Sequence, residues 1–393
     1  MLHRRNSRHG SPRRPSREPV PRADETGLPP GQPCRGVLET DPKGHGFLRT
    51  LSLTLPRSPS DCFVPPDFIT TFRLRPGVLV EGTARERLGK SPQLVSLDRV
   101  NGHPGEAWGR MKEFAEHEVV SPSEWIRLEG KGNNLAMRVV DLFCPLGRGQ
   151  RALIVSPPKA GKTMLMQQLA HAISVNHPDI DLVVLLIDER PEEVTDMRRS
   201  IKGEVFASSV DTDRGNQVRL AQLVLEYARR KVEGGKDVVL LLDSLTRLGR
   251  AFNIHQQSSG RTMSGGIDIR ALEIPKRIFG AARKLEGHGS LTILATALVD
   301  TNSRMDELIF QEFKGTGNME LVLDRDLANE RIFPAINLGL SGTRREELLF
   351  GPAVGEHQAL RRSVARLGPR EAMLALHKLL EQYPTNDLLL GKF

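Results

Sequence analysis

The run from Ser156 to Thr163 has the composition of a loop that binds nucleotide phosphates. Its residues are Ser156, Pro157, Pro158, Lys159, Ala160, Gly161, Lys162 and Thr163. Consecutive backbone N–H groups of such a loop point at phosphate oxygens, and a glycine lets the backbone approach closely. Lys162 supplies a positive charge for the β- and γ-phosphates, and Thr163 supplies a hydroxyl for Mg²⁺. The sequence therefore predicts a site for ATP and Mg²⁺, although Ser156 stands where the usual pattern has glycine.

Two carboxylates that follow apolar runs are candidates for the chemistry beside this loop. Asp243 ends one run, and an aspartate at such a strand end holds the Mg²⁺ shell in doubly wound sheets. Taken alone it would more often cap a helix, but the preceding loop favours the metal role. Glu189 follows another run and is the candidate for polarising the attacking water, with Arg190 beside it as a further catalytic candidate. Asp188 is expected to cap a helix over residues 191–201.

The elements around these residues alternate between strand and helix patterns. Residues 163–174 and 218–232 place apolar side chains at helical spacing. Short apolar runs typical of buried parallel strands lie at residues 152–155, 182–187, 238–242 and 291–298. This alternation predicts an α/β domain over residues 138–350, with a mainly parallel sheet and helices on both faces, followed by a helical segment over 351–393.

The part of the chain before this domain has a different character. Residues 34–103 contain short alternating segments separated by Pro, Gly and Asp, which predicts a small β-barrel or sandwich. Its strands are expected near residues 36–39, 46–50, 68–74, 78–82 and 93–100. Residues 104–137 are expected to form a connector.

Composition limits the class of protein. At 38% hydrophobic and 26% charged residues the chain fits an ordinary soluble protein. No apolar run is long enough to span a bilayer, so no membrane partner is expected.

Most of the net charge of +8 lies in the first 22 residues, which hold seven arginines against Glu18. The tail over residues 1–33 is therefore expected to be disordered, either as a solubilising segment or as a nucleic-acid arm. Cys34, Cys62 and Cys144 are far apart in the sequence and are expected to be free thiols that form no ligand pair, in a reducing cytoplasm.

Several longer strings closely resemble the bacterial Rho family of transcription termination factors. They are SPPKAGKTMLM at 156–166, LLIDERPEEV at 185–194, LLDSLTR at 241–247, PKRIFGAAR at 275–283, EFKGTGNME at 312–320 and SGTRREEL at 341–348. The resemblance implies a homohexameric ring of RecA-like P-loop ATPase domains, each preceded by an OB/cold-shock-like barrel. It also implies an RNA-dependent ATPase and 5′→3′ translocase, or helicase, that acts on nascent single-stranded transcripts, with RNA polymerase as the expected partner.

The resemblance assigns roles to residues of the nucleotide site. Lys159 and Lys162 are implied to bind phosphates, Thr163 and Asp243 to handle Mg²⁺, and Glu189 to activate water.

Two arginines match positions at the subunit boundary, and two further residues match positions beside the base. Arg344 matches an arginine finger that reaches into the neighbouring subunit's site, and Arg331 matches a second interfacial arginine. Such a guanidinium stabilises transition-state charge and makes hydrolysis depend on ring closure. Met164 and Phe333 match the pair that flanks the adenine ring.

Two loops are implied to line the channel of the ring and to contact RNA. They are residues 257–266, which include Arg261, and residues 300–304, which include Arg304. The family has lysines near both positions, so the positive charge is kept in this chain. Without the resemblance, both segments would be interpreted as ordinary surface loops.

The barrel is implied to be the first RNA site, with contacts from His45, Phe47, Arg49 and Phe63. Aromatic rings in such domains stack on bases, which contributes roughly 1–3 kcal/mol per base. The family usually has Phe at the position of His45 and a tyrosine-containing strand where this chain has Pro92 and Gln93. Stacking is therefore expected to be weaker or differently selective.

Two other functions remain open at the level of sequence. A rotary or secretion ATPase shares the fold but does no RNA work, and the barrel together with the string at 312–320 speaks against it. A paralogue that binds RNA without turning over ATP is disfavoured by Lys162, Glu189, Asp243 and Arg344.

Deleting residues 1–30 tests whether the basic tail is a nucleic-acid arm. Because each phosphate contact adds to the salt dependence of binding, the deletion should lower RNA affinity and flatten its dependence on salt concentration. Affinity for a short single-stranded RNA, measured between low and physiological salt, checks this. Unchanged binding would leave the tail as a solubilising segment.

Overall fold

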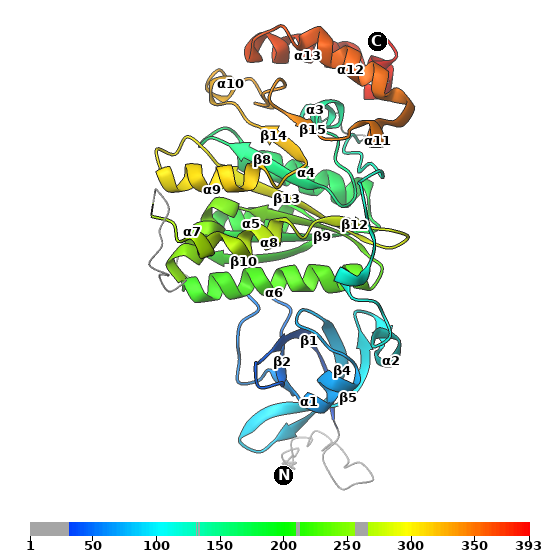
Figure 1. Cartoon of the computed structure of the whole chain (residues 1–393), viewed down its shortest axis with the longest axis vertical. Helices are drawn as coiled ribbons and strands as arrows, with labels where there is room; N and C mark the ends of the chain where they lie inside the picture. Colours follow the sequence, from blue (N-terminus) through cyan, green and yellow to red (C-terminus); the bar gives the residue numbers. More distant parts are fainter. Residues whose placement is uncertain (1–30, 131, 133, 210–212, 256–265) are drawn as a thin grey trace, which may run out of the picture.

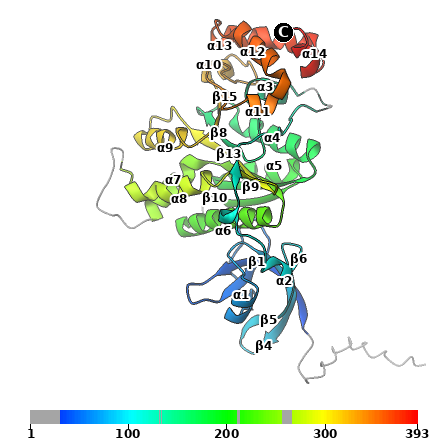
Figure 2. The same cartoon turned by 45° about the vertical axis from the view of Figure 1, so that its right-hand side comes forward.

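The computed structural model describes residues 31–393 except 131, 133, 210–212 and 256–265. Figure 1 shows a small β-barrel at the bottom, a sheet with helices on both faces in the middle, and the C-terminal helices at the top. The same order appears in Figure 2, in which the view is turned by 45°. The predicted fold class, a barrel followed by an α/β domain with a mainly parallel sheet, is confirmed.

The N-terminal barrel closes on itself. Its strands follow the order β3-β2-β1-β4-β5, and β3 pairs back onto β5 through Phe63 and Gln93. The pairing of β4 with β5 shifts register at three places, which bends these strands around the core. The strands are β1 (Gln32–Thr40), β2 (Gly46–Arg49), β3 (Cys62–Val64), β4 (Leu79–Arg87) and β5 (Lys90–Val100), with β6 (His103–Pro104) beside β5.

The strand predicted at residues 68–74 is wrong, because helix α1 (Pro66–Thr71) occupies this part of the chain. Pro65 precedes the helix in extended backbone and Pro66 lies in its first turn, where proline is favoured. Phe68 and Phe72, one turn apart, stack on each other and pack against the barrel core. The short strand β3, which follows Asp61, was not predicted.

The three cysteines are free thiols, as predicted. Closure of the barrel brings two of them to one core: Cys62 in β3 is buried in it, and Cys34 at the start of β1 packs against it.

The α/β domain is built on a sheet with the order β10-β9-β11-β13-β8-β14-β15, and β12 and β7 lie off this path beside β13. Neighbours from β10 to β14 are parallel, and β15 is antiparallel. The strands are β7 (Val119–Val120), β8 (Arg151–Ser156), β9 (Ile180–Glu189), β10 (Glu204–Ser209), β11 (Asp237–Asp243), β12 (Arg283–Leu285), β13 (Ser290–Leu298), β14 (Met319–Val322) and β15 (Gly342–Thr343). The four apolar runs predicted as buried strands are confirmed as parts of β8, β9, β11 and β13.

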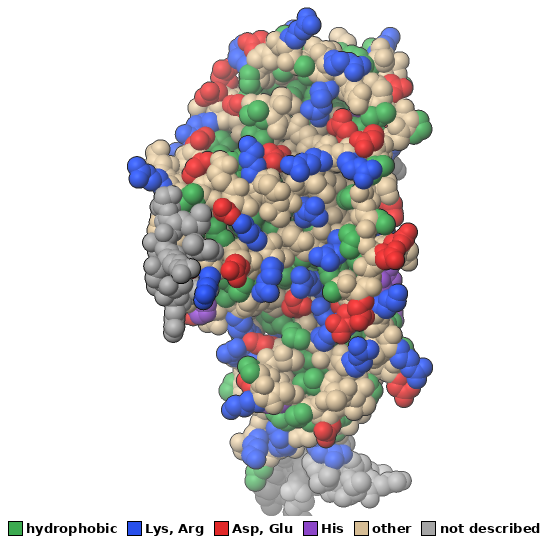
Figure 3. Space-filling model, in the orientation of Figure 1, with side chains coloured by type: hydrophobic (Ala, Val, Ile, Leu, Met, Phe, Trp, Pro, Cys, Tyr) green, Lys and Arg blue, Asp and Glu red, His purple; other side chains and the backbone are tan. Residues whose placement is uncertain are grey.

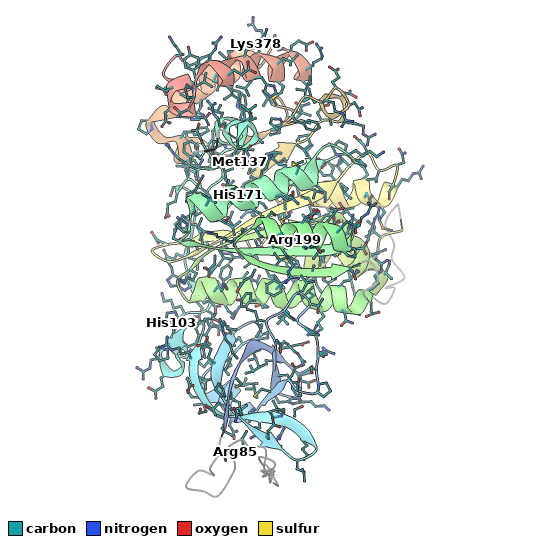
Figure 4. All side chains as sticks on the ribbon, turned by 180° about the vertical axis from the view of Figure 1, so that it is seen from behind. Arg85, His103, Met137, His171, Arg199 and Lys378 are labelled. Atoms are coloured by element: carbon teal, nitrogen blue, oxygen red, sulfur yellow. The ribbon has the colours of Figure 1, made fainter. Side chains whose placement is uncertain are left out.

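Helices cover both faces of this sheet because its strands are apolar on both sides. In β9, Leu182 and Val184 belong to the core that contains α4 and α5, whereas Val183 and Leu185 belong to the core that contains α6 and α7. Figure 4 shows α5, which carries the labelled Arg199, lying over the sheet. These helices are α4 (Lys162–Asn176), α5 (Pro191–Ser200), α6 (Arg214–Glu233) and α7 (Leu245–His255).

The remaining helices connect the two cores and close the C-terminal end. Arg138 in α3 is fully buried, and its guanidinium donates to Asn386 Oδ1 and to the carbonyl oxygens of Leu380 and Tyr383, which fixes the C-terminal helices against α3. These helices are α2 (Gly105–Trp108), η1 (Phe114–Glu116), α3 (Leu135–Phe143), η2 (Ile269–Leu272), α8 (Glu273–Phe279), α9 (Arg304–Lys314), α10 (Arg325–Asn329), α11 (Glu347–Phe350), η3 (Gly351–Ala353), α12 (Val354–Val364), α13 (Pro369–Gln382) and α14 (Asn386–Leu390). Among the described residues, none of the helices has both the length and the apolar character that crossing a membrane requires.

The barrel rests on α6, the helix below the sheet in Figure 1. Gly77 approaches this helix so closely that a Cβ atom would lie 2.3 Å from the carbonyl carbon of Glu226, and its φ of +88° also favours glycine. Near the end of α6, Arg75 forms an ion pair of 2.8 Å with Glu233, which also accepts a hydrogen bond from the Phe114 N–H. His103, labelled in Figure 4, lies 3.1 Å from the carbonyl oxygen of Gly234.

A second polar contact fixes the barrel to the middle of α6. Glu39 in β1 accepts hydrogen bonds from Arg49, Arg57 and Arg219, at 2.6, 2.8 and 2.8 Å. Burial acts to raise the pKa of Glu39, but the hydrogen bonds from Arg219, Arg57 and Arg49 outweigh it and lower the pKa to about 2. Arg219 comes from α6, so the ionised form of Glu39 joins the two domains.

Glu39→Gln tests this contact. A carboxylate with a lowered pKa stabilises the folded state above its unfolded pKa of about 4.3, and this stabilisation is lost as the pH falls toward 2. The variant should lose on the order of 3 kcal/mol at neutral pH, and its stability should fall less steeply than that of the wild type below pH 5. Urea denaturation at several pH values measures both effects.

The matched control is Glu81→Gln, because Glu81 pairs with Arg35 in an exposed ion pair and should contribute little. Equal stabilities of wild type and Glu39→Gln across this pH range would contradict the account.

Candidate nucleotide site and nucleic-acid groove

The nucleotide site lies where three parallel strands end. The carboxyl ends of β8, β9 and β11 lie at one edge of the sheet, because these strands are joined in register through parallel pairing with β13 and with each other. The phosphate-binding loop follows β8, and Glu189 and Asp243 are the last residues of β9 and β11. Ligand sites of parallel α/β sheets form at this edge. The sheet therefore brings together residues that the sequence places far apart.

Lys162 lies between the two carboxylates. Its Nζ is 2.6 Å from Asp243 Oδ1 and 3.5 Å from Glu189 Oε1. Asp243 is 3% exposed and Glu189 is 1% exposed, so a single ammonium group offsets part of the charge of two buried acids. Thr296 Oγ1 also donates to Asp243 Oδ1 at 2.7 Å and fixes the orientation of that carboxylate.

The loop itself has the backbone that phosphate binding needs. Gly161 has a φ of +88° and immediately precedes α4, so the N-terminus of that helix faces the site. Ser156 and Pro157 are buried, whereas Pro158 and Lys159 are exposed. Lys159 is therefore accessible to a phosphate, as predicted from the resemblance.

Thr163 and Asp243 suit an Mg²⁺ ion that also binds nucleotide oxygens. Both provide the hard oxygen donors that Mg²⁺ prefers. Thr163 Oγ1 donates to Glu193 Oε2 at 3.2 Å, so a third oxygen donor lies beside it. The donor set thus fits the predicted cofactor.

The surroundings of Glu189 raise its pKa. Burial raises its pKa, and the neighbouring charge of Asp243 acts in the same direction, while Lys162 and Arg247 oppose them. Arg247 lies 3.3 Å from Glu189 Oε2, an oxygen that accepts no hydrogen bond within the described part of the chain. Oε2 therefore has free acceptor capacity for a water molecule.

Asp188 does not cap α5, contrary to expectation. Arg190 is the residue at the N-cap position, no side chain caps the helix, and Asp188 Oδ1 has no hydrogen-bond partner in the described structure. Asp188 has a φ of +59°, which turns the chain so that Glu189 points into the site. Arg190 is exposed at the start of the helix.

A cavity of about 470 Å³ opens beside the loop and has the character of a base-binding slot. Met164 and Phe333 lie on its walls and are 63% and 44% exposed, although both are large apolar residues. Its lining is Asn134, Leu135, Ala136, Ala160, Gly161, Met164, Leu165, Gln168, Leu323, Phe333, Pro334 and Ala335. A flat heterocycle can enter between the two side chains while its phosphates reach the loop.

Arg344 lies at the opposite edge of the sheet from the loop of its own subunit. Its N–H donates to the carbonyl oxygen of Asn318, and the preceding Thr343 pairs with Met319, which in turn pairs with Ala152 near the beginning of β8. The loop follows the other end of β8, roughly 13 Å away at 3.3 Å per residue. Arg344 is exposed, and its predicted role as an arginine finger stays a prediction.

Arg331 has a different position. It is exposed, has a φ of +62°, and precedes Phe333 by two residues, so it lies near the base-binding slot of its own subunit.

Three aromatic rings gather on the barrel. His45 lies 5.7 Å from Phe47 and 5.3 Å from Phe63, and Phe47 and Phe63 are 5.7 Å apart, measured between ring centroids. An adjoining cavity of about 620 Å³ is lined by Phe47, Pro59, Phe63, Arg87, Gly89, Lys90 and Ser91. Rings beside cations are what single-stranded nucleic acid requires, because bases stack and phosphates need positive charge.

Arg87 is part of this groove and was not predicted. Its guanidinium lies 4.9 Å from the centre of the Phe63 ring and donates to Gln93 Oε1 and to the carbonyl oxygen of Ser91, at 2.8 and 2.9 Å. Gln93, at the place where the resemblance implied a tyrosine-containing strand, orients an arginine over the aromatic ring. A planar guanidinium is able to stack on a base, so Arg87 is a further candidate for an RNA contact.

Arg49 lies beneath this surface, with its guanidinium 5.2 Å from the centre of the Phe47 ring. It is buried and donates to Glu39 and to Asp61, both at 2.6 Å. Since these carboxylates occupy its guanidinium, the structure favours a structural role over the predicted RNA contact. Arg304 is exposed at the start of α9, whereas Arg261 lies outside the described residues.

Comparisons with known proteins define the class. Residues 136–343 match the family "ATP synthase alpha/beta family, nucleotide-binding domain", and residues 34–106 match "Rho termination factor, RNA-binding domain". An ATPase from a type III secretion system superposes with a TM-score of 0.57 at 21% identity, over 76% of this chain and 87% of that one, which shows the fold alone. The fold and site are those of a RecA-like P-loop ATPase domain joined to an OB-like RNA-binding barrel.

Curated relatives define the family. Transcription termination factor Rho of Neisseria gonorrhoeae is 50% identical over 324 residues, which are 81% of this chain and 77% of that protein. Transcription termination factor Rho of Aquifex aeolicus is 49% identical over 360 residues, 90% of this chain and 83% of that protein. The chain belongs to the transcription termination factor Rho family.

Phe333→Ala tests the base-binding slot. Loss of one stacking face should raise KM for ATP about tenfold and leave kcat nearly unchanged, because the ring contacts the base equally in the ground and transition states. Steady-state ATP hydrolysis measures both constants. Phe393→Ala, at a ring that is 41% exposed near the C-terminus, is the matched control and should behave as wild type. A fall in kcat without a change in KM would contradict the assignment.

Arg247→Gln tests the electrostatic environment of Glu189. A general base works only when ionised, so activity should rise with pH through the raised pKa of Glu189. Removing the positive charge of Arg247 should raise the pKa of Glu189 further. On the acid side of the pH profile, the pH at which kcat/KM is half-maximal should then increase by about one unit. Arg127→Gln, which removes an exposed ion pair with Asp387 and a contact with the Trp125 ring, should leave the profile unchanged. An unshifted profile in Arg247→Gln would exclude this role.

Proposed function

We propose that this chain is an RNA-dependent ATPase that assembles into a homohexameric ring, moves 5′→3′ along single-stranded RNA and terminates transcription by acting on RNA polymerase complexes in the cytoplasm. The observation that supports this most is the aromatic and cationic groove on a barrel that is tightly joined to the ATPase domain. RNA held by Phe47 and Phe63 lies on a barrel that Glu39 and Gly77 join to α6, and α6 packs directly under the catalytic sheet. Binding and hydrolysis can therefore be coupled through one helix.

Hydrolysis uses the residues gathered at the edge of the sheet. Lys159 and Lys162 bind phosphate oxygens, and the adenine lies between Met164 and Phe333. Glu189, held beside Lys162, accepts a hydrogen bond from the attacking water and orients it toward the γ-phosphate.

Magnesium and residues of a neighbouring subunit complete the site. Mg²⁺, held by Thr163 and Asp243 together with the nucleotide, supplies charge neutralisation for the phosphates. Arg344 cannot reach the loop of its own subunit and serves the site of the next one, where its guanidinium stabilises the charge that develops on the phosphoryl group. Arg331 lies at the same boundary.

RNA passes from the barrel to the channel of the ring. In this proposal Arg261 and Arg304, which begins α9, contact the RNA phosphates. Figure 3 shows basic and acidic side chains interspersed over one face of the molecule, without a single large basic patch. In this proposal, affinity for RNA comes from the groove and the channel loops, together with the tail.

A function as a secretion-type ATPase has less support, although the secretion ATPase shares the fold. The rings at His45, Phe47 and Phe63 with Arg87 beside them are suited to bases. A regulator that binds RNA without hydrolysis is also disfavoured, because Lys162, Glu189 and Asp243 are assembled at hydrogen-bonding distances.

Steady-state ATP hydrolysis with and without a cytidine-rich RNA tests the proposal, with Lys162→Ala as the inactive control. Strong stimulation by RNA is expected. Equal turnover with and without RNA would support the secretion-type reading, and an absence of turnover in wild type would support the regulator.

A further inference from the structure

The chain segment that carries Arg344 is held on both sides by one guanidinium group. Arg361 in α12 donates from Nη1 to the carbonyl oxygens of Ser341 and Leu338, at 2.9 and 3.4 Å. Its Nη2 lies 3.8 Å from Glu346 Oε2. Ser341 precedes Arg344 by three residues and Glu346 follows it by two. Arg361 therefore fixes the backbone before Arg344 and a side chain after it.

The same guanidinium joins this segment to the end of α3. Arg361 Nη2 donates to the carbonyl oxygen of Phe143, the last residue of α3, and the guanidinium lies 5.2 Å from the centre of the Phe143 ring. A carbonyl at the C-terminus of a helix has no partner within the helix and carries partial negative charge, so a cation beside it is favourable. Figures 1 and 2 show α3, β15 and α12 beside one another at the upper end of the molecule. Arg361 thus connects three segments that are far apart in the sequence.

Two further contacts hold the backbone at Arg344. Thr343 Oγ1 donates to the carbonyl oxygen of Pro145, and the Arg344 N–H donates to the carbonyl oxygen of Asn318, both at 2.8 Å. The same oxygen of Asn318 accepts a hydrogen bond from Gln150, which is buried beside the sheet. The backbone of Arg344 is therefore held from the sheet, and Arg361 holds the chain on either side of it from α12.

The guanidinium of Arg344, by contrast, is available. It takes part in no hydrogen bond or ion pair with the residues that the structure describes, and the residue is exposed. Arg344 and Arg361 line the same cavity of about 450 Å³. A fixed backbone with an unoccupied charged group is what a residue needs when it must act at a defined point outside its own site.

We propose that Arg361 is the positioning residue for Arg344, and that it aims the Arg344 guanidinium at the nucleotide of the neighbouring subunit. This role rests on the proposed function of Arg344 as an arginine finger. A misplacement of about 1 Å in a reacting group costs on the order of 100-fold in rate, so the place of the segment matters as much as its charge. Arginine suits the position because its planar fork presents five N–H donors in fixed directions, whereas a lysine ammonium is a single point charge.

The kinetic constants of Arg361→Ala test this role. The rate constant kcat for RNA-stimulated ATP hydrolysis should fall by about 100-fold, because the finger stabilises charge that develops only in the transition state. The KM for ATP should stay nearly unchanged, because the phosphate-binding loop and the base-binding slot do not contact Arg361. Arg362→Ala is the matched control: Arg362 is the next residue of α12, is exposed and carries the same charge, so this variant should behave as wild type. A wild-type kcat in Arg361→Ala would overturn the proposal.

Mixed rings separate the positioning role from general damage to the subunit. In rings of Arg361→Ala and Lys162→Ala subunits, some boundaries pair an intact loop with an intact finger, so RNA-stimulated ATPase activity should recover. In rings of Arg361→Ala and Arg344→Ala subunits, every boundary has a defective finger, so activity should stay at the level of the separate variants. Failure of the first mixture, or recovery in the second, would contradict the positioning role.

The mixture of Lys162→Ala and Arg344→Ala distinguishes failure of this role from failure of the proposed function. An absence of recovery in that mixture would show that Arg344 does not serve a neighbouring site, and both proposals would fall. Recovery in that mixture, together with a wild-type kcat in Arg361→Ala, would overturn the positioning role alone.

Arg361→Lys provides a second variant if Arg361→Ala does not fold. The lysine keeps the positive charge but cannot donate in fixed directions to carbonyl oxygens on two segments at once, so kcat should lie several-fold below that of wild type, again with little change in KM. A folded Arg361→Lys with the kcat of wild type would overturn the proposal.

Discussion

The nucleotide site depends on one constraint, the parallel pairing of β8, β9 and β11 that makes these strands end at the same edge of the sheet. This edge places Lys162 between Asp243 and Glu189, two carboxylates that are almost completely buried. Such acids are costly to bury without a partner, so the lysine supports the folded site as well as the phosphate. The same burial holds the pKa of Glu189 above its usual range.

The sheet that assembles these groups also fixes the place of Arg344. β15 runs antiparallel at the far side and ends at the level where β8 begins, so Arg344 lies away from the loop of its own chain. In the proposed ring, Arg344 therefore serves the site of the next subunit. The barrel packs on α6, and α6 packs against the sheet, so the proposed RNA groove is connected to the nucleotide site through this helix.

The sequence predicts those elements whose formation depends on the residue pattern within the element itself. Contiguous apolar runs identified four of the parallel strands, because buried strands need apolar residues on both faces. The sequence predicts a strand over residues 68–74 instead of helix α1, since spacing of two and spacing of four are hard to separate in a short segment. It predicts Asp188 as a cap, although the turn at that position directs the neighbouring Glu189 into the site. The position of Arg87 over an aromatic ring requires closure of the barrel, which no local pattern encodes.

The central claim is that each hydrolytic site is completed by a neighbouring subunit, and mixing two inactive variants tests it most directly. Lys162→Ala removes the phosphate-binding lysine, and Arg344→Ala removes the finger, so neither should hydrolyse ATP alone. In a mixed ring, some boundaries pair the intact loop of an Arg344→Ala subunit with the intact finger of a Lys162→Ala subunit. The account predicts that mixing and reassembly restore a clear fraction of RNA-stimulated ATPase activity. Mixtures that remain as inactive as the separate variants would contradict it.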